Sequence, residues 1–417
     1  MNGIGRKFTT LCVTAVAAAL LAAALPELAN GDSGALVSQG PDEARPTPCD
    51  HPGAGHGRPS CPGVRDPYRD LQWNLDVILA ESAWKHATGK GVVVAVIDTG
   101  VDQDHPDLVG KLLILEGAAI AGPSDEGPED HNAHGTMMAG IVAAATNNGI
   151  GISGGAPGAT VMPIRYAMFD VRQPDLGLVE TYQNVLDPSK LTEAIRFATE
   201  NGADVISISQ GFPVYPDDYP AWVEMRAAID EAWAAGIVIV AAAGNSGAGA
   251  EVGEIEGCLT PADHPLVLCV GATTREDGIA SDSSFDGKHP RYLVAPGGDG
   301  TACEGRVLTT WPVGFQDFFS PFLGDDAGYM CRIDDAYNAG SGTSQAAPLV
   351  AAVAAMLLEQ GLTNEQVVDR ILHTADDLGE PGRDAIFGWG RLNALRAVTD
   401  DRNDDGADGA SPVPNGW

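Results

Sequence analysis

Residues 91–100 have the sequence GVVVAVIDTG, an apolar and β-branched run of strand length that ends at Asp98-Thr99-Gly100. A strand that is apolar on both faces is typical of a parallel sheet with helices packed on each side. The run therefore predicts a buried strand with Asp98 at its carboxyl end. An Asp there either caps the next turn or belongs to a functional site, because the loops at this edge of a parallel sheet converge on a crevice.

The segments that follow alternate between helix and strand. Hydrophobic periodicity predicts, in chain order, helix 191–199, strand 205–209, helix 221–235 and strand 237–243. An apolar helix rich in small residues is predicted over 345–359, and a capping box at 363–366 opens another helix. This alternation predicts an α/β fold with a central, mostly parallel β-sheet that is covered by helices on both faces.

The charge balance excludes two classes of partner. The 417 residues include 24 basic and 57 acidic ones, which gives a formal net charge of −33. So acidic a surface repels nucleic acid and anionic membranes, and we expect neither as a partner. With 44% hydrophobic residues, the chain still carries enough apolar material for a large folded core.

The amino-terminal segment is typical of a signal peptide. Arg6 and Lys7 precede an apolar run over 11–25, which is shorter than the roughly 20 residues that a membrane anchor needs. No later segment is long and apolar enough to span a membrane, so we expect a secreted mature chain. The expected organisation is a signal peptide at 1–30, a Gly- and Pro-rich extension at 31–65, one folded domain at 66–398 and an acidic tail at 399–417.

Six cysteines remain after the signal segment, which contains Cys12. An even number in an exported protein predicts disulfides, although six cysteines allow 15 connectivities. We expect each cysteine to pair with its neighbour in sequence, in the pairs Cys49–Cys61, Cys258–Cys269 and Cys303–Cys331. None of them has the C-x-x-C spacing of a zinc site.

Two further motifs contain residues of catalytic type. His134 opens HGTMMAG, residues 134–140, and Ser344 lies in GTSQAAP, residues 342–348, each directly before a helical run. Either motif alone has a plain structural explanation, as a histidine at a helix start, with His131 as a rival candidate, or as a serine N-cap. A Ser at a helix start also lies near unpaired N–H groups and the positive end of the helix dipole, which favours developing negative charge.

The three motifs occur in the order Asp, His, Ser. Together, Asp98-Thr99-Gly100, His134-Gly135-Thr136 and the GTSxAxP pattern around Ser344 resemble the signatures of the subtilisin-like serine peptidases, over residues 66–398. The resemblance implies a three-layer subtilisin-like fold and a serine endopeptidase acting on polypeptides. Asp98 would then orient His134, His134 would act as general base, and Ser344 would be the nucleophile.

The resemblance also implies the rest of the site. Residues 241–245, AAAGN, are similar to the family strand whose terminal Asn supplies an oxyanion donor, here the Asn245 side chain beside the backbone N–H of Ser344. The implied substrate-binding residues pair with an added substrate strand or line the S1 pocket, and they are Ser209, Gln210, Gly211, Ala242, Ala243 and Gly244. Gln210 stands where the family usually has an apolar residue.

A structural calcium ion is implied in the same way. Asp66, Asp107 and the loop at 145–152 resemble the strong calcium site of thermitase-type subtilases. The implied ligands are side-chain and carbonyl oxygens of Asp66, Asp107, Ala145, Asn148, Ile150 and Ile152, the all-oxygen set that a hard cation prefers. Ordinary turn and cap residues are the alternative explanation. The ion would pin the amino-terminal arm to the catalytic domain.

Other functions remain open beside a monomeric endopeptidase. A dedicated processing protease or a transpeptidase would use the same triad, and a catalytically silent scaffold would keep only the fold. A metallopeptidase is disfavoured because the sequence has no H-E-x-x-H motif.

Overall fold

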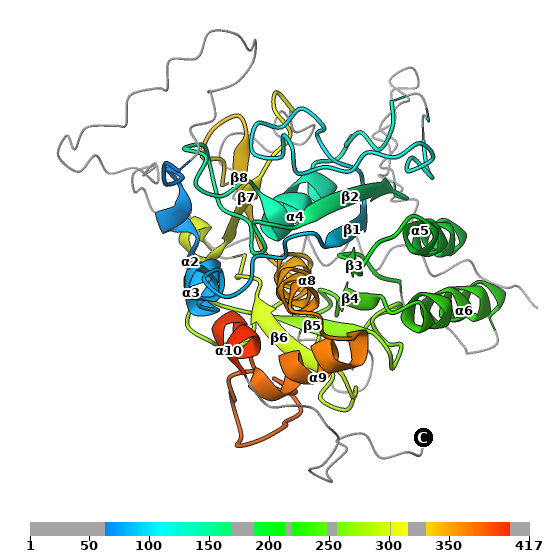
Figure 1. The fold of residues 1–417 in the computed structure, drawn as a ribbon. Helices are drawn as coiled ribbons and strands as arrows, with labels where there is room; N and C mark the ends of the chain where they lie inside the picture. The colour runs from blue at the N-terminus through cyan, green and yellow to red at the C-terminus, as the bar shows by residue number, and fades with distance from the viewer. Residues whose placement is uncertain are drawn as a thin grey trace, which may run out of the picture. The chain divides into compact units, whose positions relative to one another are not determined.

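The computed structural model describes residues 63–122, 124, 126–167, 187–212, 219–247, 257–300, 302–315 and 331–400. All of them lie in the compact unit Pro46–Trp417. Their centre is a six-stranded parallel sheet in the order β2-β1-β3-β4-β5-β6 (Figure 1). Its strands are β1 (Val93–Asp98), β2 (Thr160–Arg165), β3 (Val205–Ile208), β4 (Val238–Ala242), β5 (Leu268–Thr273) and β6 (Tyr292–Pro296).

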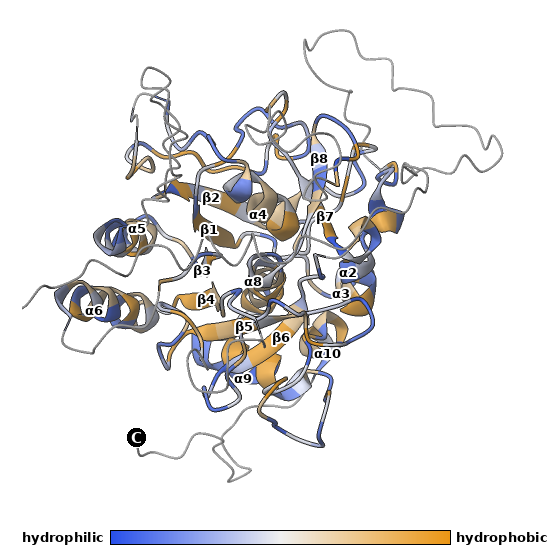
Figure 2. Cartoon of the chain, turned by 180° about the vertical axis from the view of Figure 1, so that it is seen from behind, coloured by the Kyte–Doolittle hydropathy of each residue, from blue (hydrophilic) through white to orange (hydrophobic). Residues whose placement is uncertain are grey.

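Side chains along each strand alternate between two apolar cores, because successive residues of a strand point to opposite faces. In β1, Val94 and Val96 belong to one core, whereas Ala95 and Ile97 belong to the other. Figure 2 shows the strands as largely hydrophobic, as a sheet buried on both faces requires. The first core is closed by α4 (His134–Ala143) and α8 (Thr343–Glu359), and the second by α5 (Pro188–Glu200) and α6 (Pro220–Ala234) (Figure 1).

The predicted α/β class and the mostly parallel sheet with helices on both faces are therefore confirmed. One boundary differs at the site, because α8 begins at Thr343 and Ser344 is the second residue of the helix. The capping box is confirmed at the start of α9 (Asn364–Thr374), where the Thr363 and Gln366 side chains accept each other's backbone N–H. The last described helix is α10 (Ala394–Thr399), which packs on α8 and α3 (Ala80–Ala83).

A smaller layer lies beside α4. Strands β7 (Val307–Thr310) and β8 (Tyr337–Gly340) form an antiparallel pair, preceded by the short helix η3 (Cys303–Gly305). The amino-terminal part contributes η1 (Arg69–Leu71) and α2 (Trp73–Val77). Within the described ranges, no helix has both the length and the apolar character needed to cross a bilayer.

Two of the three expected disulfides are confirmed. Cys258 pairs with Cys269, and Cys303 pairs with Cys331. The first bond joins buried Cys258 to Cys269 in β5, and the second joins Cys303 in η3 to Cys331 before β8. The expected pair Cys49–Cys61 lies outside the described residues.

The start of α4 approaches the end of β1 so closely that only glycine fits there. A Cβ added to Gly135 would lie 2.1 Å from the carbonyl oxygen of Gly100, a backbone atom that cannot move aside. The Gly135 N–H donates to the Thr99 hydroxyl at 2.9 Å, which holds the two segments at this close approach. The small residue in the His134-Gly135-Thr136 motif is therefore what lets His134 reach the strand that ends in Asp98.

We expect Gly135→Ala to lower the free energy of unfolding by about 1–3 kcal/mol, the usual cost of overpacking. The matched control is Gly278→Ala, because a Cβ at Gly278 would meet its nearest neighbour at an ordinary 3.4 Å. Thermal or denaturant unfolding of both variants makes the comparison. Equal stability of the two variants would contradict the assigned contact between Gly135 and Gly100.

Candidate active site

Three neighbouring strands end where the predicted residues gather. Asp98 is the last residue of β1, Ser209 follows β3 directly, and Asn245 lies three residues after β4. These strands are adjacent and parallel, so their carboxyl ends lie side by side. His134 is the first residue of α4, and Ser344 is the second residue of α8.

The His134 side chain is directed at Asp98. Its Nδ1 lies 2.7 Å from Asp98 Oδ1, which also accepts the Thr99 backbone N–H at 2.8 Å. The Asp98 side chain is 1% exposed and that of His134 is 26% exposed, so the imidazole borders the solvent while the carboxylate is buried. Burial lowers the pKa of His134, but the Asp98 charge and hydrogen bond and the Asp130 charge raise it, and the net direction is upward. The site therefore favours an imidazolium more than water does.

Asp130 holds the turn that leads into α4. Its Oδ1 accepts the Thr99 hydroxyl and the backbone N–H groups of Asn132 and Ala133. Its Oδ2 accepts both the N–H and the hydroxyl of Thr136. Because Asp130 is only 5% exposed, these bonds are made away from solvent, and they fix the orientation of α4 at the end of β1.

Ser344 and Ser209 exchange two hydrogen bonds. The Ser344 hydroxyl donates to the Ser209 carbonyl at 2.9 Å, and the Ser209 hydroxyl donates to the Ser344 carbonyl at 2.9 Å. The Ser344 carbonyl receives no helical N–H from four positions on, because that residue is Pro348. Among the hydrogen bonds of the described residues, none joins the Ser344 hydroxyl to His134.

The amide of Asn245 is fixed by its oxygen. Oδ1 accepts the backbone N–H and the hydroxyl of Thr343, both at 2.9 Å. The Thr343 hydroxyl in turn accepts the Gly244 N–H at 3.1 Å, which ties β4 to the start of α8. With its oxygen engaged, the side chain has its NH₂ group left for an additional acceptor.

Gln210 turns its side chain inward. Its Nε2 donates to Asp98 Oδ1 at 3.3 Å, and its Oε1 accepts the Tyr166 hydroxyl at 2.9 Å. Tyr166 directly follows β2, the neighbour of β1, and is fully buried. Burial raises the pKa of Tyr166 well above its usual value, and the Asp98 charge raises it further, so the phenol stays protonated and donates its hydrogen bond to Gln210.

The other predicted substrate-binding residues lie on two segments. Ser209 and Gly211 follow β3, while Ala242 ends β4 and leads into Ala243 and Gly244. A third segment, Cys258–Thr260, lies between them and pairs with both through backbone bonds from Leu259 to Ala243 and between Thr260 and Phe212.

The predicted calcium ligands also come together. Asn148 donates through Nδ2 to Asp107 Oδ1 at 2.8 Å, and its backbone N–H donates to Asp66 Oδ1 at 2.9 Å. Burial raises the pKa of Asp107 to about 7 against three hydrogen bonds that lower it, and the Asp66 charge also raises it. Burial likewise raises the pKa of Asp66. Two buried carboxylates thus lie close enough to repel each other.

These residues suit a hard cation in part. Among the described residues, no hydrogen bond ends on the carbonyl oxygens of Ala145, Ile150 or Ile152, which leaves three acceptors for an ion. The Asn148 oxygen instead accepts the Ile150 N–H at 2.8 Å, so the amide would have to turn before that oxygen could bind a metal. Clusters of three or more His, Cys, Asp or Glu side chains are absent from the described ranges, and the predicted set contains only two carboxylates.

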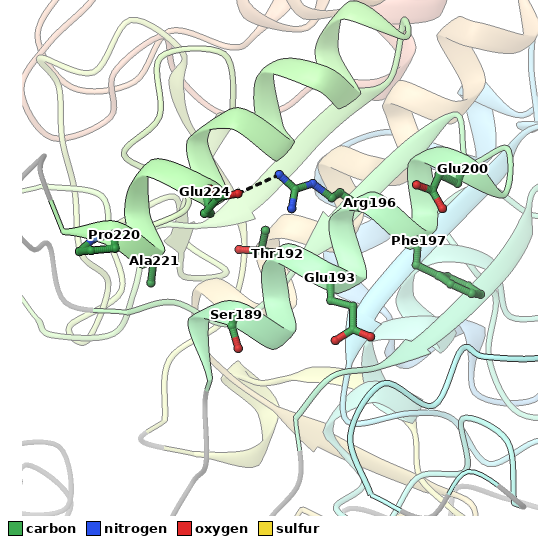
Figure 3. A pocket seen from close by; sticks show the side chains of 9 residues that line it. All are labelled: Ser189, Thr192, Glu193, Arg196, Phe197, Glu200, Pro220, Ala221 and Glu224. Atoms are coloured by element: carbon green, nitrogen blue, oxygen red, sulfur yellow. Dashed lines mark hydrogen bonds and ion pairs between the residues drawn. The ribbon is translucent and has the colours of Figure 1, made fainter.

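One pocket lies away from all these residues. It has a volume of about 600 Å³ and is lined by residues of α5 and α6 (Figure 3). Arg196 at its centre forms ion pairs with Glu224 and Glu231 on α6. This guanidinium is therefore already paired across the two helices, and the pocket contains none of the predicted catalytic or substrate-binding residues.

Sequence reasoning missed four residues with clear positions at the site. Asp130 lies four residues before His134 and Thr343 directly precedes Ser344, so the neighbourhood of the quoted motifs was the available signal for both. Tyr166 and Leu259 gave no comparable signal, because only the pairing of distant segments brings them to the site.

The comparisons with known proteins agree with this geometry. Residues 89–390 match the family described as Subtilase family. The chain is 33% identical over 333 residues to a thermophilic serine proteinase of Bacillus sp. (strain AK1), covering 80% of this chain and 68% of the relative. It is 32% identical over 340 residues to thermitase of Thermoactinomyces vulgaris, covering 80% of this chain and 98% of the relative.

A solved structure has the same fold. A protease from Pseudoalteromonas arctica PAMC 21717 is 26% identical, with a TM-score of 0.62 over 81% of this chain and 98% of the other. The expected subtilisin-like resemblance is thereby confirmed. The chain belongs to the subtilase family and is a serine-type endopeptidase.

Proposed function

We propose that this endopeptidase cleaves peptide bonds through a triad of Asp98, His134 and Ser344 and a covalent acyl-enzyme. The observation that carries the proposal is the 2.7 Å hydrogen bond from His134 to buried Asp98, at the sheet edge where Ser344 begins α8. A buried carboxylate that accepts the Nδ1–H of the imidazole selects the tautomer whose Nε2 can accept a proton. The same carboxylate stabilises the imidazolium that results.

The bond changes follow from these roles. Ser344 Oγ attacks the substrate carbonyl carbon while His134 Nε2 takes the hydroxyl proton. The C–N bond then breaks, and His134 returns the proton to the leaving amine. Water next attacks the acyl carbon, His134 removes its proton, and the C–O bond to Ser344 breaks with return of that proton to Oγ. Serine and imidazole end as they began.

The Ser344 hydroxyl has to turn before it can react. In the free protein it donates to the Ser209 carbonyl, which is also an acceptor on the predicted substrate edge. A substrate strand that pairs with this edge offers its own N–H to that carbonyl. Substrate binding therefore competes for the acceptor that holds the hydroxyl and releases it toward His134.

The oxyanion would be met by two donors. The Asn245 amide oxygen accepts both the backbone N–H and the hydroxyl of Thr343, and the NH₂ group of the same amide is left for another acceptor. The backbone N–H of Ser344 lies in the first turn of α8, where helical N–H groups lack partners within the helix. Loss of one such donor typically costs a factor of about 10²–10³ in turnover.

We also propose that the enzyme is secreted and acts on polypeptides as a monomer. The basic and apolar segment before residue 30 supports export, and the net charge of −33 supports solubility without a nucleic-acid partner. A processing protease or a transpeptidase would use the same triad on a narrower set of acceptors. Digestion of casein at many sites distinguishes a general endopeptidase from both.

The triad predicts a single reaction with a fluorophosphonate probe. We expect intact-mass analysis to find one adduct on the parent protein and none on Ser344→Ala, because only an activated hydroxyl attacks the probe. Ser341→Ala, a neighbouring serine without a proposed role, should keep the adduct. A folded parent that takes up no probe would instead support the catalytically silent scaffold.

We propose a structural Ca²⁺ for the cluster around Asp66 and Asp107. The support is a pair of buried carboxylates beside three carbonyl oxygens that have no hydrogen-bond donor among the described residues, and the resemblance to the thermitase-type site. Ala145, Ile150 and Ile152 would supply the carbonyls, and Asn148 would bind through its oxygen once the amide turns. An ion there would neutralise the repulsion of the two carboxylates and join the residues around Asp66 to the loop at 145–152.

Calcium should raise the melting temperature of the Ser344→Ala protein, which cannot digest itself, and a chelator should reverse the increase. An ion present at about 100 times its Kd would stabilise the folded state by about 2.7 kcal/mol. Asp107→Asn should remove the response, whereas Asp230→Asn, which changes an exposed carboxylate on α6, should keep it. A melting temperature that is equal with calcium and with chelator would exclude the site.

A further inference from the structure

We propose that Leu259 closes the S1 pocket, so that the enzyme prefers substrates with a small side chain on the acyl side of the scissile bond. This inference rests on the proposed function, because it assigns Ser209–Gly211 and Ala242–Gly244 to the two walls of that pocket. Leu259 belongs to neither wall.

Backbone hydrogen bonds place Leu259 between the walls. Its N–H donates to the Ala243 carbonyl at 2.9 Å, on the β4 side. The next residue, Thr260, exchanges hydrogen bonds with Phe212 on the β3 side, at 3.0 and 2.7 Å. The segment is thus paired with both walls and spans the space between them.

The Leu259 side chain occupies this space. A Cβ added to Gly211 would lie 2.9 Å from Leu259 Cβ, and one added to Gly244 would lie 2.6 Å from Leu259 Cδ1. The isobutyl group therefore lies against the backbone of both walls at once. Leu259 is partly exposed, as a residue that faces a binding site would be, while Cys258 beside it is 1% exposed and bonded to Cys269.

These contacts set the depth of the pocket. The disulfide and the backbone pairing hold Leu259 in place, so an incoming large side chain cannot displace it by moving the segment. An aromatic acyl-side residue would compete with the isobutyl group for the same volume, whereas Ala or Ser would not. The predicted substrate class is therefore polypeptides cleaved after small residues.

The test compares two peptide p-nitroanilides, succinyl-Ala-Ala-Pro-Ala and succinyl-Ala-Ala-Pro-Phe. We expect the parent to have the higher kcat/KM on the Ala substrate. Leu259→Ala should move the ratio toward Phe by about 10-fold or more, since each methylene of fit in an apolar pocket is worth about 10–200-fold. Leu266→Ala, a partly buried leucine before β5 at the far end of the strand, should leave the ratio unchanged.

A parent that prefers Phe, or a ratio that Leu259→Ala leaves unchanged, would overturn the assignment of Leu259. Failure of the proposed triad has a different outcome, because the parent would then hydrolyse neither substrate and would not react with the fluorophosphonate probe. The folded state of each variant is checked by its melting temperature.

A separate set of contacts carries a second inference. We propose that Gln210 is a positioning residue whose amide, oriented by Tyr166, weakens the hold of Asp98 on His134. Gln210 Nε2 and His134 Nδ1 both donate to the same oxygen, Asp98 Oδ1. The other oxygen, Oδ2, is buried and has no hydrogen-bond partner among the described residues. Because Oδ1 also accepts the Thr99 backbone N–H, the charge of Asp98 is shared on one atom among three donors, of which Gln210 and His134 are the two side chains.

The direction of the effect follows from the charges. Asp98 at the end of β1 and Asp130 in the turn before α4 both favour the charged form of His134, and Tyr166 is neutral. The positive end of the Gln210 amide near Oδ1 opposes them. Removing that amide should leave more of the Asp98 charge to His134 and raise the pKa of His134.

The test is an NMR titration of His134, which needs no activity and stays informative if the triad proposal fails. Gln210→Met keeps the length of the side chain without its donor, and we expect it to raise the pKa of His134 by about half a unit, the scale of one weak hydrogen bond. Tyr166→Phe should cause a smaller shift in the same direction and add nothing to Gln210→Met. His289, buried elsewhere, should keep its pKa in every variant.

An unchanged or lowered pKa of His134 in Gln210→Met would overturn the role of Gln210. A Tyr166→Phe shift that persists at full size in the double variant would show that the phenol acts on Asp98 directly, and would overturn the orienting role given to it.

Discussion

Parallel alignment of β1, β3 and β4 is the constraint on which the candidate site depends. Because the three strands run the same way in adjacent places, Asp98, Ser209 and Asn245 arrive together at one edge of the sheet. The two helices that supply His134 and Ser344 pack on one face of the same sheet. Each functional side chain is therefore held by the core and not by a loop alone, and small shifts between them would require the core to repack.

Buried hydrogen bonds, in addition to core packing, fix the helix starts against the strand ends. Asp130 joins the turn before α4 to Thr99, and Thr343 joins α8 to the end of β4. Both use a buried side chain to bind several neighbouring groups, so that a helix start and a strand end are fixed relative to each other. This arrangement keeps His134 and Asn245 in defined orientations without a substrate present, as catalysis by preorganised groups requires.

The sequence was sufficient to predict the α/β fold, and its motifs named most residues of the candidate site. Apolar runs such as residues 91–97 identify strands buried on both faces, and the motifs around Asp98, His134 and Ser344 have local signals at strand and helix ends. Local signals could not show that Gln210 bonds Asp98 or that Leu259 lies between two walls, because those contacts join segments far apart in the chain. The orientation of the Asn148 amide could not be predicted from the sequence either, because it depends on contacts with Asp107 and Ile150 that form only in the folded loop.

Pro348 affects the candidate site because it has no backbone N–H. Because Pro348 has no N–H, α8 lacks the helical hydrogen bond to the Ser344 carbonyl, and that oxygen accepts the Ser209 hydroxyl. An amino acid with a backbone N–H at that position would also donate to the Ser344 carbonyl, so this oxygen would be shared between the helix and the Ser209 hydroxyl. Pro348 therefore influences the candidate site through the backbone N–H that it lacks, although its side chain carries no polar atom.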